Sequence, residues 1–183
     1  DRVDSRFGGL DILVNNAGIT GPVVNAEGMD MAAWDDTMAV NARGTILGIK
    51  YAVPLMRRRG GGSIINMSSL MGLRGTPMRS AYTASKFAVL GITDAVAQEV
   101  GVDNIHVNAL CPGAVNGELM QRVIAARSAA ENRPAAEVIR AHYTDKAALR
   151  RWIEPEEVAE AALFLATSGA ITGERLRVDA GRF

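Results

Sequence analysis

Short apolar runs alternate with longer helical patterns along the whole chain, and this order constrains the fold more than any other feature. Between the runs, apolar residues recur at helical spacing, over 31–59 and from about 80 to 99. A strand, a helix and the next parallel strand form a right-handed crossover, so the order predicts an α/β fold with a parallel sheet flanked by helices. The apolar runs lie at 10–15, 63–67, 105–110 and 176–178.

Three further segments carry signals of their own. The run from Leu10 to Asn15 is nearly continuous, which predicts a strand buried on both faces and followed by a turn at Asn16-Ala17-Gly18. The polar, arginine-rich stretch 118–151 predicts a helical excursion from the sheet. Pro155 begins an amphipathic helix, because proline is favoured in a first helical turn and glutamates follow it.

The composition predicts one globular domain over residues 1–183. Apolar residues make up 48% of the chain, charged residues make up 22%, and the net charge is zero. A chain of this length buries a substantial core, and the composition excludes a disordered protein. The basic run Arg57 to Arg59 closes a predicted helix, where positive charge is favourable, so we expect no nucleic-acid partner.

The compartment is predicted from what the chain lacks. Cys111 is the single cysteine, so no internal disulfide forms, which suits a reducing compartment. No apolar run reaches about 20 residues, the length that spans a bilayer, and no apolar leader opens the sequence. We therefore expect a cytoplasmic protein with no membrane partner. His106 and His142 lack the spacing of metal ligands, so we assign no metal.

A tyrosine and a lysine are placed to interact near the start of the helix that begins at about residue 80. Tyr82 and Lys86 are four residues apart, so both lie on one helix face. Use of a tyrosine as a base at neutral pH requires about 4 kcal/mol of phenolate stabilisation. An ammonium about 4 Å away supplies roughly that energy at an effective dielectric constant near 20. The pair is therefore predicted to act as an acid or base.

Candidate site residues also follow the predicted strands. Asn15, Ser69 and Pro112 lie at the carboxyl ends of three strands, where open parallel sheets bind ligands in one crevice. Ser69 precedes Tyr82 by 13 residues, and its hydroxyl is suited to donate to a carbonyl oxygen on which negative charge develops. Singly, each of these residues also has a structural interpretation, as a loop cap or a surface pair. Their joint order and spacing favour a site.

The pattern resembles that of the short-chain dehydrogenase/reductase family over nearly all 183 residues. The resemblance implies a Rossmann-like fold and hydride transfer between NAD or NADP and a small alcohol or carbonyl substrate, because no side chain supplies a hydride. It also implies a homo-oligomer, either a dimer or a tetramer. The matching motifs are Asn15-Asn16-Ala17-Gly18, Asn41, the Ser69, Tyr82 and Lys86 spacing, Pro112-Gly113, and Val178-Asp179-Ala180-Gly181.

The resemblance further implies a role for each matching residue. Tyr82 is the expected catalytic acid/base, and Ser69 is expected to orient the carbonyl. Lys86 is expected to lower the pKa of Tyr82 and to hold the nicotinamide ribose, and Asn41 to complete a water-mediated proton relay. The expected cofactor-binding residues are Asn15, Ala17, Gly18, Tyr82, Lys86, Pro112, Gly113 and Val115.

The sequence departs from the family's pattern in two places. The family's first strand, glycine-rich turn and helix, which hold the cofactor pyrophosphate, have no match before Asn15. The chain is therefore expected to be truncated at its N-terminus and to lack the first strands of the fold. The strand at 10–15 then becomes an exposed edge, and we expect the isolated chain to aggregate, dimerise or bind cofactor poorly. Secondly, Asn116-Gly117 replaces a usual threonine.

Other functions remain open. One is a lyase or dehalogenase on the same fold, although Lys86 argues against it because relatives without the nucleotide tend to carry arginine there. Another is a non-catalytic or inactive remnant of the fold that assembles with partners. Basic residues exceed acidic ones over 117–151, which leaves an anionic substrate open.

Overall fold

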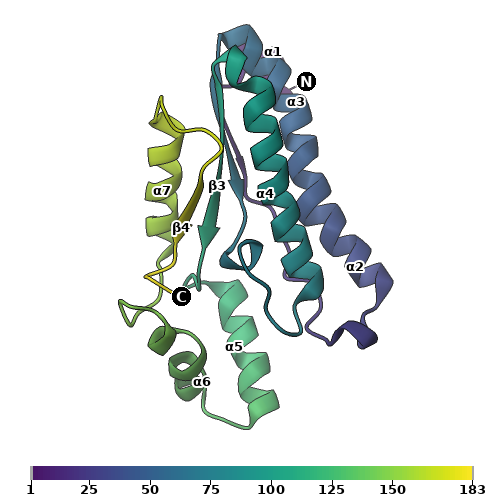
Figure 1. Cartoon of the computed structure of the whole chain (residues 1–183), viewed down its shortest axis with the longest axis vertical. Helices are drawn as coiled ribbons and strands as arrows, with labels where there is room; N and C mark the ends of the chain where they lie inside the picture. The colour runs from purple at the N-terminus through teal and green to yellow at the C-terminus, as the bar shows by residue number, and fades with distance from the viewer. Residues whose placement is uncertain (1, 183) are drawn as a thin grey trace.

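Four parallel strands form the sheet of this protein, which a computed structural model describes over residues 2–182. The order of the strands in the sheet is their order in the sequence. All four point the same way, so their carboxyl ends lie together at one end of the sheet, the lower end in Figure 1. The predicted parallel sheet is therefore confirmed. The strands are β1 (Ile12–Asn15), β2 (Gly62–Met67), β3 (Ile105–Pro112) and β4 (Arg175–Val178).

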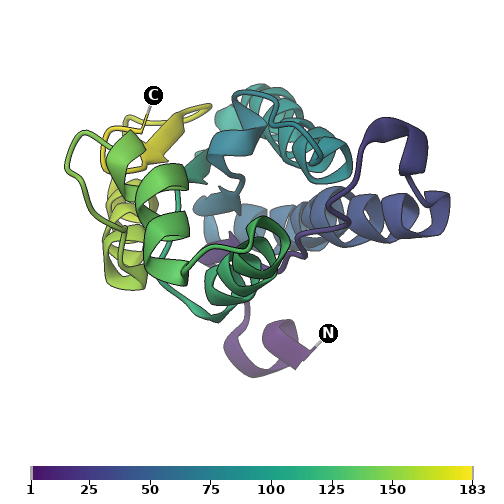
Figure 2. The same ribbon diagram turned by 90° about the horizontal axis from the view of Figure 1, so that it is seen from below.

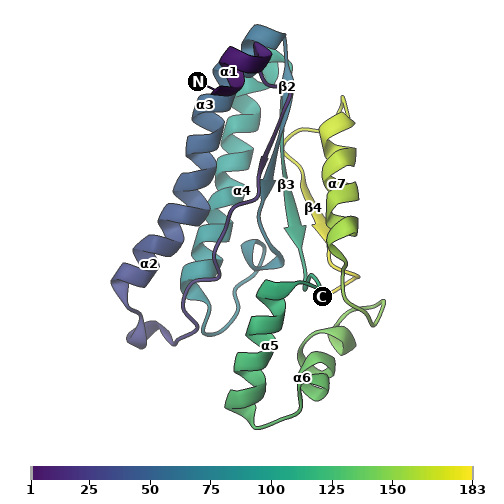
Figure 3. The same ribbon diagram turned by 180° about the vertical axis from the view of Figure 1, so that it is seen from behind.

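Two long helices cover one face of the sheet. α3 (Gly44–Arg59) and α4 (Ser80–Val100) lie side by side in Figures 1 and 3. Met56 of α3 and Val96 of α4 pack with Ile64 of β2 in one buried cluster. Each such side chain stabilises the fold by roughly 1.5–3 kcal/mol through removal of its apolar surface from water.

One helix covers the opposite face. α7 (Pro155–Thr167) packs Leu165 against Ile65 and Leu110 of the sheet. Pro155 stands in its first turn, as predicted from the sequence. Helices therefore flank the sheet on both sides, which confirms the predicted α/β architecture (Figure 1).

The prediction that the first strand is buried on both faces is wrong. Ile12 and Val14 of β1 are each 45% exposed, whereas Leu13 packs against the core beneath α3 and α4. The physical reason is position: β1 is an edge strand, and α7 packs over β2, β3 and β4 instead. Within residues 2–182, β1 pairs with β2 alone.

The helical pattern over 31–59 folds as three consecutive segments. α2 (Met31–Met38) begins where the Asp30 carboxylate accepts a hydrogen bond from the Ala32 N–H at 3.1 Å. A π-helical turn follows over Ala39–Arg43, and α3 then continues through Pro54. The wider turn was not predicted. Such turns change the direction of the side chains within a helix, and this one carries Asn41.

The predicted helical excursion lies beyond the carboxyl ends of the strands. It comprises α5 (Glu118–Glu131) and α6 (Ala135–His142), which Figure 2 shows from below. Val138 and Tyr143 are buried with Ile124, and the Tyr143 ring stacks on Trp152 with 5.4 Å between ring centroids. This small cluster gives the excursion a core of its own.

The other elements are short. No helix described between residues 2 and 182 is long and apolar enough to cross a membrane. Within residues 2–182, no three or more His, Cys, Asp or Glu side chains form a group that could hold a metal ion. The short elements are α1 (Arg2–Phe7) and the 3-10 turns at Ala26–Gly28, Leu70–Gly72, Gly101–Asp103 and Thr144–Lys146.

Candidate active site

The predicted catalytic residues meet where β2 ends and α4 begins. β2 ends at Met67, and the chain then turns so that Ser69 caps the short turn Leu70–Gly72. The Ser69 hydroxyl accepts a hydrogen bond from the Met71 N–H at 3.2 Å. Tyr82 lies in the first turns of α4, close enough for the Ser69 side chain to affect its pKa. Ser69 and Tyr82 therefore lie in the same part of the structure, and their catalytic pairing stays a prediction.

Close packing holds this turn against α4. The Ser68 hydroxyl donates to the Lys86 carbonyl oxygen at 2.9 Å. A Cβ added to Gly72 would lie only 2.8 Å from that carbonyl oxygen and 2.3 Å from the Ser68 Oγ. Glycine at position 72 thus permits the approach that brings Ser69 to Tyr82.

Lys86 is buried beneath Tyr82. Its Nζ donates a hydrogen bond to the Met67 carbonyl oxygen at 2.8 Å and lies 5.6 Å from the centroid of the Tyr82 ring. Burial lowers the pKa of Lys86 to about 8, against a weaker opposing influence of Cys111. At neutral pH the side chain is therefore still mainly an ammonium, in a position where its charge is costly.

The expected lowering of the Tyr82 pKa by Lys86 is not found. Burial raises the pKa of Tyr82, and the hydrogen bond from Ser69 and the charge of Arg79 oppose the rise only in part. The physical reason is geometric, because the Lys86 ammonium lies against the ring and bonds to a carbonyl oxygen. Tyr82 is thus a protonated phenol at neutral pH, ready to donate rather than to accept a proton.

Asn41 joins the loop after β1 to α4. Its Oδ1 accepts from the Ile19 N–H at 2.8 Å, and its Nδ2 donates to the Ile19 carbonyl oxygen and to the Ser85 Oγ, both at 2.9 Å. Ser85 in turn donates to the Tyr82 carbonyl oxygen at 2.8 Å. Asn41 therefore fixes the position of the first turns of α4. The predicted water relay through it stays a prediction.

The residues around the turn after β1 have different roles: one holds the sheet together and another lies beside the site. The Asn15 amide donates to the Asn66 Oδ1 at 2.8 Å, so its side chain holds β1 to β2. Gly18 lies beside the site, since a Cβ there would be 3.2 Å from the Asn41 Oδ1 and 3.5 Å from the Lys86 Nζ. Ala17 is exposed next to it.

The residues after β3 lie at the same end of the sheet, beyond the carboxyl ends of the strands. Pro112 ends β3, and the Gly113 N–H donates to the Val178 carbonyl oxygen at 2.9 Å. Val115 forms an isolated parallel bridge with Ile153. In such a bridge the bonds run through the residues on either side of Val115, so its own N–H and C=O point away from Ile153.

Sequence reasoning missed two residues of this site. Ser85, which connects Asn41 to Tyr82, carried no distinctive signal. Arg79 lies against Tyr82, with its Cζ 4.9 Å from the ring centroid, and is 8% exposed. Its position three residues before Tyr82 was a usable signal, since it stands just outside the predicted helix.

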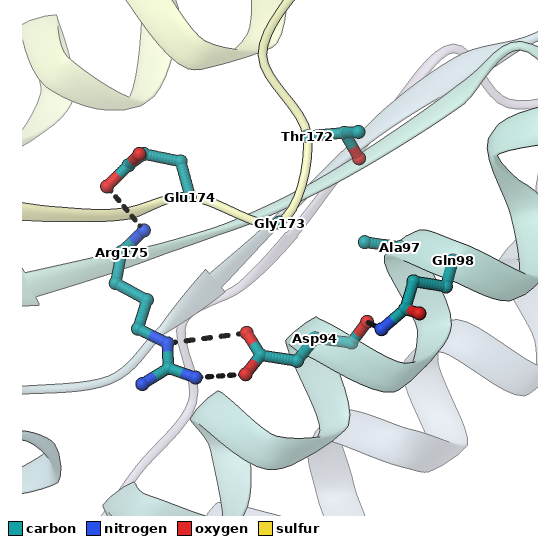
Figure 4. Close-up of a pocket in the computed structure, with 7 residues that line it drawn as sticks. All are labelled: Asp94, Ala97, Gln98, Thr172, Gly173, Glu174 and Arg175. Atoms are coloured by element: carbon teal, nitrogen blue, oxygen red, sulfur yellow. Dashed lines mark hydrogen bonds and ion pairs between the residues drawn. The ribbon is translucent and has the colours of Figure 1, made fainter.

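A separate pocket lies between α4 and the loop that leads into β4 (Figure 4). The Asp94 carboxylate forms an ion pair there with the Arg175 guanidinium. The two charges neutralise one another, and Ser69, Tyr82 and Lys86 are not among the lining residues. This pocket is therefore distinct from the candidate site.

Comparison with known proteins gives consistent matches over almost the whole chain. The family model described as enoyl-(acyl carrier protein) reductase matches residues 1–182. An uncharacterized oxidoreductase of Thermotoga maritima is 43% identical over 178 residues, which are 96% of this chain and 68% of that protein. D-beta-hydroxybutyrate dehydrogenase of Rhizobium meliloti is 38% identical over 181 residues, 98% of this chain and 70% of the relative.

Similarity extends to solved structures. The structure described as ElxO with NADP bound superposes with a TM-score of 0.86 and 29% sequence identity. The match covers 99% of this chain and 70% of that one. A TM-score of this size indicates the same arrangement of strands and helices.

Proposed function

Because the chain belongs to the short-chain dehydrogenase/reductase family, a family of nicotinamide-dependent oxidoreductases, we propose that it interconverts a secondary alcohol and a ketone with Tyr82 as the proton carrier. The observation that carries the proposal is the position of the buried Lys86 ammonium 5.6 Å from the centroid of the Tyr82 ring, with the Ser69 side chain close enough to affect the Tyr82 pKa. The name of the Rhizobium meliloti relative, a hydroxybutyrate dehydrogenase, supports an alcohol substrate.

The residues around Lys86 fit the nicotinamide and ribose end of NAD or NADP. An ammonium has three N–H donors, and the Met67 carbonyl oxygen takes one, which leaves donors for ribose hydroxyls. Gly18, which lacks a side chain, lets the backbone approach the Lys86 Nζ. Pro112, Gly113 and Val115 would line the nicotinamide. When bound, the nicotinamide supplies or accepts the hydride.

The chain's own residues would move the proton. In carbonyl reduction, Tyr82 donates its O–H to the carbonyl oxygen, and its raised pKa keeps that proton available at neutral pH. The Ser69 hydroxyl donates to the same oxygen and stabilises the negative charge that develops on it. The phenolate that remains then takes up a proton again, which the raised pKa of Tyr82 favours at neutral pH. In alcohol oxidation the same groups act in reverse.

Substitution of Tyr82 by phenylalanine tests this role. We expect the Tyr82→Phe protein to lose a factor of about 10²–10⁴ in kcat, because the proton donor is removed while the ring remains. The assay follows NADH or NADPH absorbance with secondary alcohols and short hydroxy acids. Binding of the cofactor, followed by its fluorescence, is expected to persist.

The matched control is Tyr51→Phe, which removes the same atom from an exposed tyrosine on α3. Its turnover is expected to equal that of the unmodified protein. Equal turnover by the Tyr82→Phe protein would contradict the assignment and favour a non-catalytic role.

The assembly proposed for this chain is a homo-oligomer. Large apolar side chains are exposed on helices of both layers, including Phe87 on α4 at 46% and Leu163 on α7 at 63%. Burial of such faces in a symmetric dimer or tetramer would remove them from water. Sedimentation velocity measures the mass, and a monomer at micromolar concentration contradicts the proposal.

A further inference from the structure

Arg79 places a buried cation beside the candidate catalytic tyrosine. It stands immediately before α4 and is 8% exposed. Its Nη2 donates to the Thr20 carbonyl oxygen at 3.0 Å, and its Cζ lies 4.9 Å from the centroid of the Tyr82 ring. The Nε is buried and has no hydrogen-bond partner among the described residues. The Arg79 guanidinium, next to Tyr82, thus has an N–H group without a hydrogen-bond acceptor.

We propose that Arg79 binds an anionic group of the substrate, the carboxylate of a short hydroxy acid or of the corresponding oxo acid. The proposal rests on the function assigned above to Tyr82 and specifies the class of molecule on which that residue acts. The Arg79 Cζ lies only 4.9 Å from the centroid of the Tyr82 ring. A substrate whose reacting carbon lies at Tyr82 therefore reaches Arg79 only if its anionic group is a few bonds from that carbon.

Electrostatics favour an anion at this position. Within residues 2–182, no carboxylate forms an ion pair with Arg79. Burial lowers the pKa of the guanidinium, although arginine stays charged in proteins. A buried cation without a counterion is unfavourable, and an incoming carboxylate supplies the missing charge and acceptors.

The backbone beside Arg79 is strained, and hydrogen bonds to the loop after β1 hold it in place. Met78, the preceding residue, has a φ of 63°, in a region that a long side chain rarely adopts. Its carbonyl oxygen accepts from the Val24 N–H at 3.0 Å, and Thr20 lies on the same loop after β1. Two bonds to that loop therefore hold the residue against Tyr82.

A second group of cations lies on the side of α6. Arg182 donates to the His142 carbonyl oxygen at 3.0 Å, and its Cζ lies 5.4 Å from the centroid of the Tyr143 ring. Its pKa is lowered, first by burial and then by the charges of Arg74 and Arg127. Arg127, which pairs with Glu131 at 3.7 Å, also contributes to lowering the pKa of Arg79.

The experiment compares short 2- and 3-hydroxy acids with their methyl esters, which keep the alcohol and lose the charge. The unmodified protein is expected to have a higher kcat/KM for at least one acid than for its ester. Arg79→Gln is expected to lower that acid-to-ester ratio about 100-fold, the loss typical of a hydrogen-bonded charged pair. Arg79→Lys retains a charge without the planar fork, and is expected to lower the ratio about tenfold.

The matched control is Arg122→Gln, because Arg122 is an exposed arginine on α5 that pairs with Glu118 at 3.6 Å. Its acid-to-ester ratio is expected to equal that of the unmodified protein. A merely structural role for Arg79 would lower turnover of acid and ester alike and leave the ratio unchanged, which would overturn the inference. Turnover of both compounds that depends on Tyr82 would still support the proposed function.

A second measurement covers the case in which the Arg79 variants do not fold. Butyrate and butyramide have similar shapes but differ in charge, and both are tested as inhibitors of the unmodified protein loaded with cofactor. Competitive inhibition by butyrate at a concentration about tenfold lower than that needed for butyramide supports the inference. Equal inhibition by the two compounds overturns it.

Discussion

Lys86 carries a charge that the folded protein holds at a cost. The side chain is 4% exposed, and its pKa of about 8 lies well below the 10.5 of a free lysine. The shift favours the neutral form in the folded state, so the stability that it confers is complete above about pH 10.5 and is lost as the pH falls through about 8. Near neutral pH the protein therefore sacrifices stability for this ammonium.

Replacement of Lys86 by methionine is expected to stabilise the protein at pH 7. The shift corresponds to at most about 3 kcal/mol, and loss of the bond to the Met67 carbonyl oxygen offsets part of it, so we expect a gain of about 1–2 kcal/mol in the free energy of unfolding. Turnover is expected to fall. Urea unfolding at pH 7 and pH 9.5 measures the effect.

The matched control is Lys50→Met, which removes an exposed lysine from α3. The unmodified and Lys50→Met proteins are both expected to gain stability between pH 8 and pH 10, whereas the Lys86→Met protein is not. A Lys86→Met protein whose stability rises over the same interval would show that another group titrates there.

At the scale of single residues, sequence spacing predicted which side chains meet but not their energies. Ser69, Tyr82 and Lys86 were placed together from their separation along the chain, because helix geometry and parallel strand ends fix such distances. The pKa of Tyr82 was predicted with the wrong sign, since it depends on burial and on the direction of the Lys86 ammonium. The burial of Arg79 could not be predicted from the sequence either.

At the scale of elements, the strands and helices followed closely from apolar periodicity. The strand expected over 105–110 extends to Pro112, and the helix expected from about 80 to 99 spans Ser80–Val100. The π-helical turn at Ala39–Arg43 was missed, because it depends on the hydrogen bonds of Asn41 to a distant loop rather than on local preference. The exposure of β1 depends on its neighbours in the sheet, which its own residues do not encode.

The first turn of α7 offers a test at this scale. The Glu154 side chain accepts from the Glu157 N–H, and the Glu157 carboxylate accepts from the Glu154 N–H at 2.9 Å. Glu154→Ala removes half of this reciprocal cap, and we expect a loss of about 1 kcal/mol in the free energy of unfolding. Urea unfolding at pH 7 measures it.

Glu156→Ala is the comparison for that variant, because Glu156 is exposed in the same turn and takes no part in the cap. Its effect is expected to be clearly smaller. If the two alanine variants lose equal stability, the cap does not hold the helix start.

At the scale of the whole molecule, β1 is one of the two edge strands of the sheet. Val14 is 45% exposed on a strand whose outer backbone groups pair with no other strand within residues 2–182. Such an edge is a template for pairing with another chain, and a lysine on it opposes that pairing. We therefore expect a protein of these 183 residues to associate through β1 as its concentration rises, and Val14→Lys to reduce this association. Gel filtration across a concentration series measures it.

Val102→Lys is the matched control, since Val102 is 91% exposed outside the sheet. It is expected to associate as the unmodified chain does. Association that responds equally to both lysines would locate the contact away from the edge.

The sequential strand order has a consequence for biosynthesis. Within residues 2–182, β2, β3 and β4 each pair with the strand that precedes them in the chain, so none of these three strands has to be inserted between two that are already paired. Each step closes a loop of only one crossover, which keeps the entropic penalty of long-range pairing low. These four strands can thus pair progressively as they are synthesised, and β4 is added last, at the edge opposite β1.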